Sequence, residues 1–394
     1  MLRTIALTLG LSTAVVALQH SAMWGLNSAA DGAGWATLTF DVSNLTTSQS
    51  AALPAVPAAR APPRRPPAHD LTPPPSARAR PPVEANFDKA GMQALLPLSW
   101  TTSQPEPCHA PVPHTCTHPP ACNFGCITLD PAYQSKVDAL YTAGPAAAET
   151  QRLIQKGAII GTFLGDEHLY FGVQLRELKA VADALRLAYP AGIVYLNEAP
   201  DIAMCNYRKD NSSVFGDGEC MPVNVDWFGF DFYQHDSVSW EAAREAYDAF
   251  VFPRYGRPDQ RAVPVSLGYD GRANLTAAEA AELDTFCATN AREFFAMGLA
   301  DGRFVGQFPF HYNGGVTNPD GSVTGSAGIV NLPKCLATYQ GIGKIIKAAG
   351  PAGTSQDPAP RRPRPGPDGK TFVEPKCTTP LPPAPSIWSW CARH

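Results

Sequence analysis

The sequence has no excess of positive charge. Its 394 residues include 31 lysines and arginines against 35 aspartates and glutamates, which gives a formal net charge of -4 at pH 7. A chain with this balance has no basic field that would hold nucleic acid or an anionic membrane. We therefore expect no nucleic-acid partner, and the oligomeric state stays open.

The first residues contain no apolar run long enough to span a bilayer. The run from Ile5 to Val16 covers about a dozen residues and follows Arg3, which is the pattern of a signal peptide over residues 1–17. We predict a secreted protein, extracellular or in the cell wall, with no integral membrane segment after signal cleavage. The endomembrane lumen and the plastid are the alternatives. Three Asn-x-Ser/Thr sequons agree with secretion and predict a glycoprotein; they begin at Asn44, Asn211 and Asn274.

Cysteine, in contrast, is plentiful. The chain has 10 cysteines, and an exported chain uses them mainly for disulfide bonds. We predict the pairs Cys205 with Cys220 and Cys377 with Cys391. A stretch rich in Cys and His, residues 108–126, raises zinc as an alternative, but it contains no Cys-x-x-Cys pair. We therefore predict disulfides and no metal site.

Many of the 40 prolines gather in two segments near the ends of the chain. Segments of this composition cannot bury a core, so we expect them to be extended or disordered. The predicted organisation is a signal peptide at 1–17, an N-terminal segment and Pro-rich linker at 18–82, a catalytic domain at 83–350 and a Pro-rich tail at 351–394.

Within residues 83–350, short apolar runs alternate with helical patterns, which is typical of parallel βα units. The predicted strands are Met92–Leu98, Ala158–Leu164, Gly192–Leu196, Val225–Phe232, Ala262–Leu267 and Phe304–Phe308. The predicted helices are Leu175–Leu185, Trp240–Val251, Thr276–Gly298 and Leu336–Ala349. Segments at Trp35 and Ile127 are weaker candidates for two further strands.

Polar residues follow nearly every predicted strand at its C-terminal end. A doubly wound sheet would gather its site at one switch point, whereas a barrel opens all its strand ends on one face. We therefore predict an α/β fold with a (β/α)8 TIM-type barrel, irregular or incomplete in its N-terminal third, and disordered Pro-rich flanks.

Carboxylates stand at the ends of three successive predicted strands. Asp166 and Glu167 follow the first, Glu198 follows the second, and Asp231 lies near the end of the third. Glycoside cleavage needs a carboxylic acid to protonate the leaving oxygen and a second carboxylate as nucleophile or base, about 5–9.5 Å away. We predict that Glu167 is the acid, that Asp231 or Glu198 is the nucleophile or base, and that Asp166 orients the acid or the substrate. This chemistry requires no cofactor.

Other polar and aromatic residues near the strand ends are predicted to bind the carbohydrate substrate. They are Trp100, Asn197, Tyr233, Tyr269, Asp270, Gln307, His311 and Tyr312. Aromatic residues in such positions pack in the core more often than they stack on a sugar, so their role depends on whether they face the open end.

These strand ends resemble those of glycoside hydrolases with (β/α)8 barrels. Asp166-Glu167 is similar to the Asp-Glu pair of the β-hexosaminidase families, in which Glu is the acid and Asp positions the substrate acetamide. Asn197-Glu198 is similar to the Asn-Glu of the large retaining barrel clan, in which that Glu is the acid/base. The resemblance covers isolated strand ends only, and Tyr269-Asp270 stands where that clan has its second Glu. It implies a glycosidase but leaves the choice between retention and inversion open.

Two other functions remain open on sequence alone. Asp166 or Glu167, together with Glu198 and Asp231, would suit Mg²⁺ in a barrel lyase or isomerase, although no Lys stands at a strand end. A barrel that binds carbohydrate without catalysis is the other alternative, because a fold does not determine a function.

Overall fold

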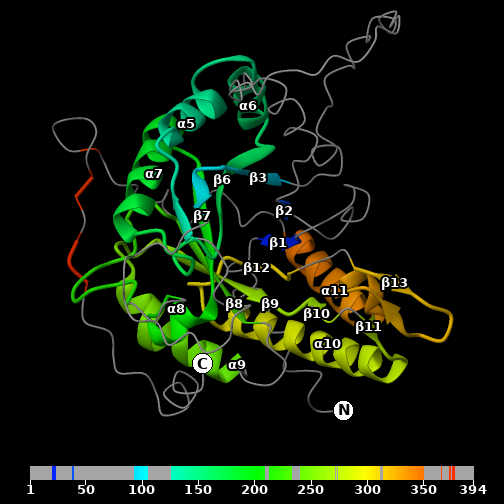
Figure 1. The fold of residues 1–394 in the computed structure, drawn as a ribbon. Coiled ribbons are helices and arrows are strands. Elements are labelled where there is room, and N and C mark those ends of the chain that lie inside the picture. The colour runs from blue at the N-terminus through cyan, green and yellow to red at the C-terminus, as the bar shows by residue number, and fades with distance from the viewer. Residues whose placement is uncertain are drawn as a thin grey trace, which may run out of the picture.

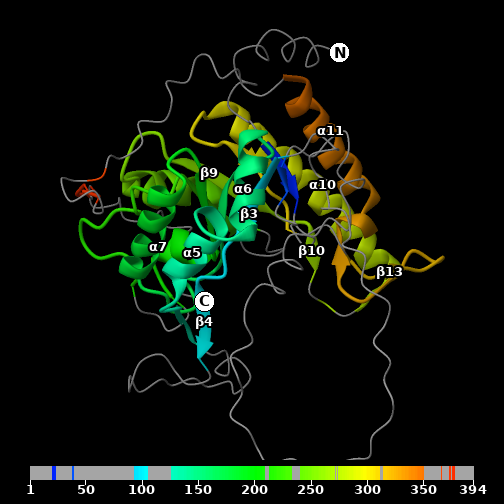
Figure 2. The same ribbon diagram turned by 90° about the horizontal axis from the view of Figure 1, so that it is seen from above.

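The computed structural model describes residues 20–23, 38–39, 93–104, 126–208, 213–232, 240–270, 272, 274–310, 314–349, 365, 372–373 and 375–377. Apolar runs form a parallel eight-stranded sheet in the order β12-β1-β2-β3-β6-β7-β8-β9. Parallel bridges join Ala262 to Phe304 and Leu267 to Phe310, and so connect the last strand of this order back to the first. The sheet therefore closes into a barrel, with the helices outside it (Figure 1, Figure 2).

The barrel strands are β1 (His20–Met23), β2 (Leu38–Thr39), β3 (Gln93–Pro97), β6 (Ile159–Asp166), β7 (Ile193–Glu198), β8 (Trp227–Phe232), β9 (Arg261–Ser266) and β12 (Gly306–Gln307). The helices are α5 (Tyr133–Tyr141), α6 (Pro145–Gln155), α7 (Leu175–Ala188), α8 (Pro200–Cys205), α9 (Trp240–Ala246), α10 (Ala277–Ala300) and α11 (Pro333–Ala349). Short helical turns are η2 (Tyr247–Val251), η3 (Phe252–Arg254) and η4 (Ile329–Asn331). Small antiparallel pairings join β4 (Thr101–Gln104) with β5 (Cys126–Leu129), β10 (Tyr269–Asp270) with β15 (Ala327–Gly328), and β11 (Asn274–Leu275) and β13 (Val316–Thr317) with β14 (Val323–Thr324).

The strand pairing confirms the predicted (β/α)8 barrel. The Trp35 segment supplies β2, and β1 comes from a segment where no strand was expected, so the barrel includes residues before 83. The Ile127 segment was wrong as a barrel strand. Its strand β5 pairs antiparallel with β4 in a hairpin, because the chain turns back on itself soon after leaving β3. The signal peptide and linker, and most of the tail, lie outside the described residues, so the domain boundaries stay predictions.

Two apolar layers follow from the alternation of side chains along each strand. The inner layer fills the barrel and takes residues from six neighbouring parts of the sheet: Leu95, Phe163, Tyr195, Trp227, Val263, Val265, Val305 and Phe308. The outer layer packs between the barrel and the helices and includes strand residues such as Leu164, Leu196 and Phe230. A strand position therefore indicates whether its side chain faces the barrel axis or the helices.

Helix α10 begins as the sequence predicts, at a capping box. The Glu279 backbone N–H donates to the Thr276 hydroxyl over 3.3 Å, and the Thr276 N–H donates to the Glu279 carboxylate over 2.9 Å. The predicted end at Gly298 was wrong. Gly298 is buried within the helix, which continues to Ala300, because a glycine ends a helix only where the backbone turns left-handed after it.

The cysteines form disulfides, but the two predicted pairs were wrong. Cys220 is bonded to Cys377, and Cys205 is bonded to a cysteine other than Cys220. Closeness in sequence misled the prediction, because the C-terminal segment returns to the loop before Cys220, where the Cys377 N–H donates to the Gly218 carbonyl over 3.1 Å. The Cys- and His-rich stretch lies almost entirely outside the described residues.

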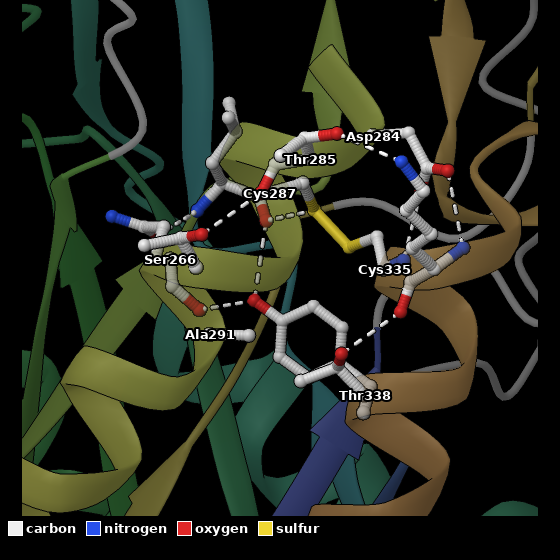
Figure 3. Close-up of a disulfide and its surroundings, with 12 residues drawn as sticks. Ser266, Asp284, Thr285, Cys287, Ala291, Cys335 and Thr338 are labelled. Atoms are coloured by element: carbon white, nitrogen blue, oxygen red, sulfur yellow. Dashed lines mark hydrogen bonds between the residues drawn. A yellow bond between two sulfur atoms is a disulfide. The ribbon is translucent and has the colours of Figure 1, made fainter. Parts of the chain in front are cut away.

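A second disulfide joins Cys287 of α10 to Cys335 at the start of α11 (Figure 3). Beside it, the Asp284 carboxylate accepts the backbone N–H groups of Lys334 over 3.2 Å and Cys335 over 2.8 Å. Asp284 thus caps α11 from the neighbouring helix. In the part of the chain that the structure describes, no helix is long and apolar enough to cross a membrane.

Candidate active site at the ends of strands β6, β7 and β8

Side-chain alternation places Asn197 and Asp231 at the C-terminal end of the barrel interior. Tyr195 and Trp227 belong to the inner apolar layer, and Asn197 and Asp231 follow them by two and four residues on β7 and β8. Gly229 lies opposite Asn197 in the register of these strands. A Cβ atom there would lie 2.4 Å from Asn197 Oδ1, so only glycine leaves room for the asparagine side chain.

A β-bulge turns Asp166 into the same space. Phe163 pairs with Tyr195 and Asp166 with Asn197, so three steps along β6 match two along β7. Gly165, inside the bulge, has a φ of 119°, a conformation that residues with a Cβ rarely adopt. Without this extra residue, strict alternation would direct Asp166 toward the helices. Sequence reasoning missed Gly165 and Gly229, although a glycine inside an apolar strand is the signal for such a bulge or close approach.

The Asn197 amide joins the two aspartates. Its Nδ2 donates to Asp166 Oδ1 and to Asp231 Oδ1, each over 2.7 Å, while its Oδ1 accepts a 3.4 Å hydrogen bond from the Tyr195 hydroxyl. The two carboxylate oxygens can therefore be no farther apart than twice the hydrogen-bond length. Asn197 and Asp231 are only 2% and 3% exposed. The structure thus brings together three of the predicted site residues.

Burial governs the charge state of this cluster. It raises the pKa of Asp166, and the hydrogen bond from Asn197 offsets part of that rise by stabilising the ionised form. Burial also raises the pKa of Tyr195, and the charges of Asp231 and Asp166 raise it further. Tyr195 therefore stays protonated at neutral pH and can donate to Asn197.

Glu167 follows Asp166 and has a strained backbone conformation. Its φ is 55°, in the left-handed region that residues other than glycine rarely occupy. Its N–H donates to the Asn197 carbonyl over 3.0 Å, and its own carbonyl accepts the Phe171 N–H over 3.0 Å. Glu167 is half-buried, and its backbone is attached to the end of β7.

Glu198 occupies the opposite side of β7 from Asn197. Its two carboxylate oxygens accept the backbone N–H groups of Leu169 over 2.9 Å and Tyr170 over 3.2 Å, and it is 1% exposed. Burial raises the pKa of Glu198, the two backbone hydrogen bonds lower it, and the nearby charges of Glu167 and Asp166 raise it further. The structure does not place this carboxylate in the Asn197 cluster. The alternation of side chains along β7 from Tyr195 to Asn197 would have predicted that Glu198 faces the other side of the strand.

Trp100 packs against His168 in the loop that follows β6. The Trp100 ring N–H donates to the Leu164 carbonyl, the residue is fully buried, and its ring centre lies 5.1 Å from that of His168. Burial lowers the pKa of His168 to about 4, so its imidazole is neutral at pH 7. Trp100 therefore supports the loop from the core, and its contact with substrate stays a prediction.

The remaining predicted substrate-binding residues are less informative. Gln307 is buried and donates to the Ser266 hydroxyl over 3.2 Å and to the Ala291 carbonyl of α10 over 3.0 Å, so it packs between strand and helix. Tyr269 and Asp270 form β10, and only their backbone is described. Tyr233, His311 and Tyr312 lie outside the described residues. Among the residues that are described, no group of three or more His, Cys, Asp or Glu could hold a metal ion.

Comparison with known proteins gives no family. No protein-family model and no curated protein matches the chain. Among solved structures, a GH10 xylanase from Thermobacillus composti is 13% identical with a TM-score of 0.36, covering 64% of this chain and 79% of its own. The xylanase XynB from Paenibacillus barcinonensis is 14% identical with a TM-score of 0.34, covering 57% and 67%. A GH5_18 protein from Streptomyces cattleya, in complex with GlcNAc, is 15% identical with a TM-score of 0.35, covering 71% and 66%. These neighbours are of the class that the strand ends resemble, but at such low scores the likeness carries no weight for function.

Proposed function

We propose that the protein is a secreted glycoside hydrolase in which Glu167 is the general acid and Asp231 the nucleophile or base. One observation carries this proposal: the Asn197 amide holds carboxylate oxygens of Asp166 and Asp231 at 2.7 Å each, at a strand end where Glu167 is the next residue. Carboxylates from neighbouring strands thus share one small region, as this chemistry requires.

The proposed reaction divides its steps between these carboxyl groups. Glu167 gives its proton to the glycosidic oxygen as the bond from that oxygen to the anomeric carbon breaks. Asp231 either bonds to the anomeric carbon, with water later displacing it, or removes a proton from the water that attacks this carbon. Asp166 shares the Asn197 amide with Asp231 and orients the reacting groups. Because Tyr195 donates to Asn197 Oδ1, the Nδ2 group faces the two carboxylates.

Asp231 suits the second role better than Glu198. Both oxygens of Glu198 are occupied by backbone N–H groups, and its side chain lies on the helix side of β7. The same geometry disfavours a Mg²⁺ lyase or isomerase site that would need Glu198 together with Asp231. Retention or inversion depends on whether water or the carboxylate of Asp231 reaches the anomeric carbon.

Turnover of aryl glycosides and of plant, algal and fungal glycans by the secreted protein tests this proposal. We expect Glu167→Gln and Asp231→Asn each to lower kcat/KM by roughly 10²–10⁴-fold, the usual contribution of acid–base catalysis. Asp248→Asn, an exposed carboxylate on η2, serves as the control and should leave turnover unchanged. Sugar binding without turnover would support a binding protein instead, and loss of activity with EDTA would support the metal-dependent alternative.

Secretion and glycosylation belong to the same proposal. Asn274 is exposed on β11, which is where an attached glycan would need to be, whereas Asn44 and Asn211 lie outside the described residues. We expect enzymatic removal of N-glycans to lower the apparent mass of the secreted protein, and Asn274→Gln to remove part of that difference. An unchanged mass would contradict glycosylation.

A further inference from the structure

We propose that Glu198 is a positioning residue for the acid: its carboxylate binds two backbone N–H groups of the loop that carries Glu167, and so holds that loop in place. This inference rests on the proposed glycosidase function, because it assigns Glu198 a role in presenting that acid.

The loop after β6 begins with a hydrogen-bonded turn that starts at Glu167. The Glu167 carbonyl accepts the Phe171 N–H over 3.0 Å, and the Leu169 carbonyl accepts the Gly172 N–H over 3.3 Å. The first N–H groups of such a turn have no partner within it. At the start of a helix, the side chain of a Ser, Thr, Asp or Asn accepts such N–H groups. Here these are the N–H groups of Leu169 and Tyr170.

Glu198 accepts both of these N–H groups from the next strand. The hydrogen bonds are 2.9 Å from Leu169 and 3.2 Å from Tyr170, one to each carboxylate oxygen. The Glu167 N–H is bound to the Asn197 carbonyl, next to Glu198 in the chain. The loop is therefore attached to the end of β7 through three backbone N–H groups, those of Glu167, Leu169 and Tyr170.

This arrangement carries an electrostatic cost. Glu198 is 1% exposed, and in the described part of the chain no Lys, Arg or His forms an ion pair with it. A buried carboxylate held only by two N–H groups is expensive, and burial accordingly raises the pKa of Glu198. Groups held at such a cost concentrate at functional sites.

The chain offers a matched control in Asp284. Its carboxylate is also buried and also accepts two successive backbone N–H groups, those of Lys334 and Cys335, at the start of α11. Glu198→Gln and Asp284→Asn make the same chemical change, because each leaves one acceptor oxygen and replaces the other by an NH₂ group. Only the first lies beside the proposed acid.

Paired substrates separate positioning of the acid from general damage. A 2,4-dinitrophenyl leaving group departs without protonation, whereas a phenyl leaving group needs the acid. With both aryl glycosides of the sugar that turns over best, we expect Glu198→Gln to lower kcat/KM at least about 10-fold for the phenyl glycoside and less than about 3-fold for the dinitrophenyl glycoside, through kcat more than KM. Asp284→Asn should lower the Tm and affect both substrates equally. An equal loss on both substrates in Glu198→Gln, or no loss on either, would overturn the inference.

Amide hydrogen exchange in the full-length protein tests the loop without any substrate. We expect Glu198→Ala to speed exchange at Leu169 and Tyr170 at least about 10-fold, while Asp284→Ala leaves both unchanged. Unchanged exchange at these two amides in an active protein would overturn the inference alone. A wild-type protein that cleaves no glycoside would overturn the proposed function and the role of Glu198 in it, and exchange would still report whether Glu198 holds the loop.

Discussion

Asp166 lies inside the end of the barrel, where burial opposes its negative charge. Burial raises the pKa of Asp166 above its ordinary value of 3.8, and the hydrogen bond from Asn197 lowers the pKa by less than burial raises it. The folded protein therefore holds a proton on Asp166 more tightly than the unfolded chain does. The stability that follows is fully present below pH 3.8 and is lost as the pH rises through the raised pKa.

Replacing Asp166 with asparagine should remove this penalty and keep an acceptor for Asn197. We expect Asp166→Asn to have the Tm of the wild type near pH 3 and a Tm about 2–4 °C higher at pH 7, the shift that about 1 kcal/mol gives in a domain of this size. Turnover at pH 7 should fall at the same time, which is the usual exchange of activity for stability. Melting curves and kinetics across pH 3–8 check this, and a Tm difference that shrinks as the pH rises would contradict it.

At this scale, sequence reasoning predicted that strand-end carboxylates come together but not which way each one faces. Parallel strand ends meet on one face, so Asp166 and Asp231 could be expected to converge. The side of the strand depends on a period of two, and an error of one residue reverses it. Alternation alone would have placed Glu198 and Asn197 on opposite sides of β7. It would also have placed Asp166 on the wrong side of β6, because the bulge at Gly165 depends on the pairing with β7. The sequence of β6 by itself does not show that pairing.

The bulge in β6 gives a test at the level of the element. An alanine at Gly165 would need a φ of 119°, and its Cβ would lie 2.4 Å from the His168 ring. We expect Gly165→Ala to destabilise the protein by about 1–3 kcal/mol and to lower kcat/KM roughly 10²-fold, because Asp166 would lose its direction. Denaturant unfolding and kinetics measure both effects. Gly302→Ala is the control, since nothing lies within 4 Å of its Cβ position, and an equal effect in both variants would argue against a special role for the bulge.

The strands themselves were predictable where burial on both faces makes a continuous apolar run. Strands β6, β7, β8 and β9 appear within two residues of their predicted bounds for this reason. Strand β1 was not expected and β5 was assigned to the wrong sheet. A strand of four residues carries little pattern, and its partner is set by tertiary contacts that its own sequence does not encode.

At the scale of the whole molecule, the fold depends on long-range pairings that the sequence alone does not predict. The disulfide between Cys220 and Cys377 spans 157 residues, and nothing in the spacing of ten cysteines selects it. The barrel likewise closes through β1, β2 and β12, which together supply few paired residues. These long-range pairings complete the barrel.

The end of the barrel opposite the proposed site is held by a buried ionic cluster around Asp226. Its Oδ2 accepts from Arg186 of α7 over 2.6 Å and from the Val194 N–H over 2.8 Å, and its Oδ1 is paired with Arg257. The Arg261 N–H donates to the Asp226 carbonyl over 2.9 Å. Asp226 therefore joins the starts of β7, β8 and β9 to α7 through its carboxylate and its backbone carbonyl, and in barrels this end serves stability.

Removing that carboxylate should separate stability from catalysis. Asp226→Ala removes the carboxylate that two buried guanidinium groups share and leaves Arg257 with Asp259 alone, so we expect a loss of about 3–5 kcal/mol in unfolding free energy. The protein that remains folded should keep kcat within about 2-fold, because the change lies at the far ends of the strands. Asp248→Ala removes a carboxylate that also meets two arginines but is 46% exposed, and it should cost no more than about 1 kcal/mol. Unfolding in urea, with turnover measured per folded molecule, checks both variants, and a large fall in kcat for Asp226→Ala would mean that the two ends of the barrel are coupled.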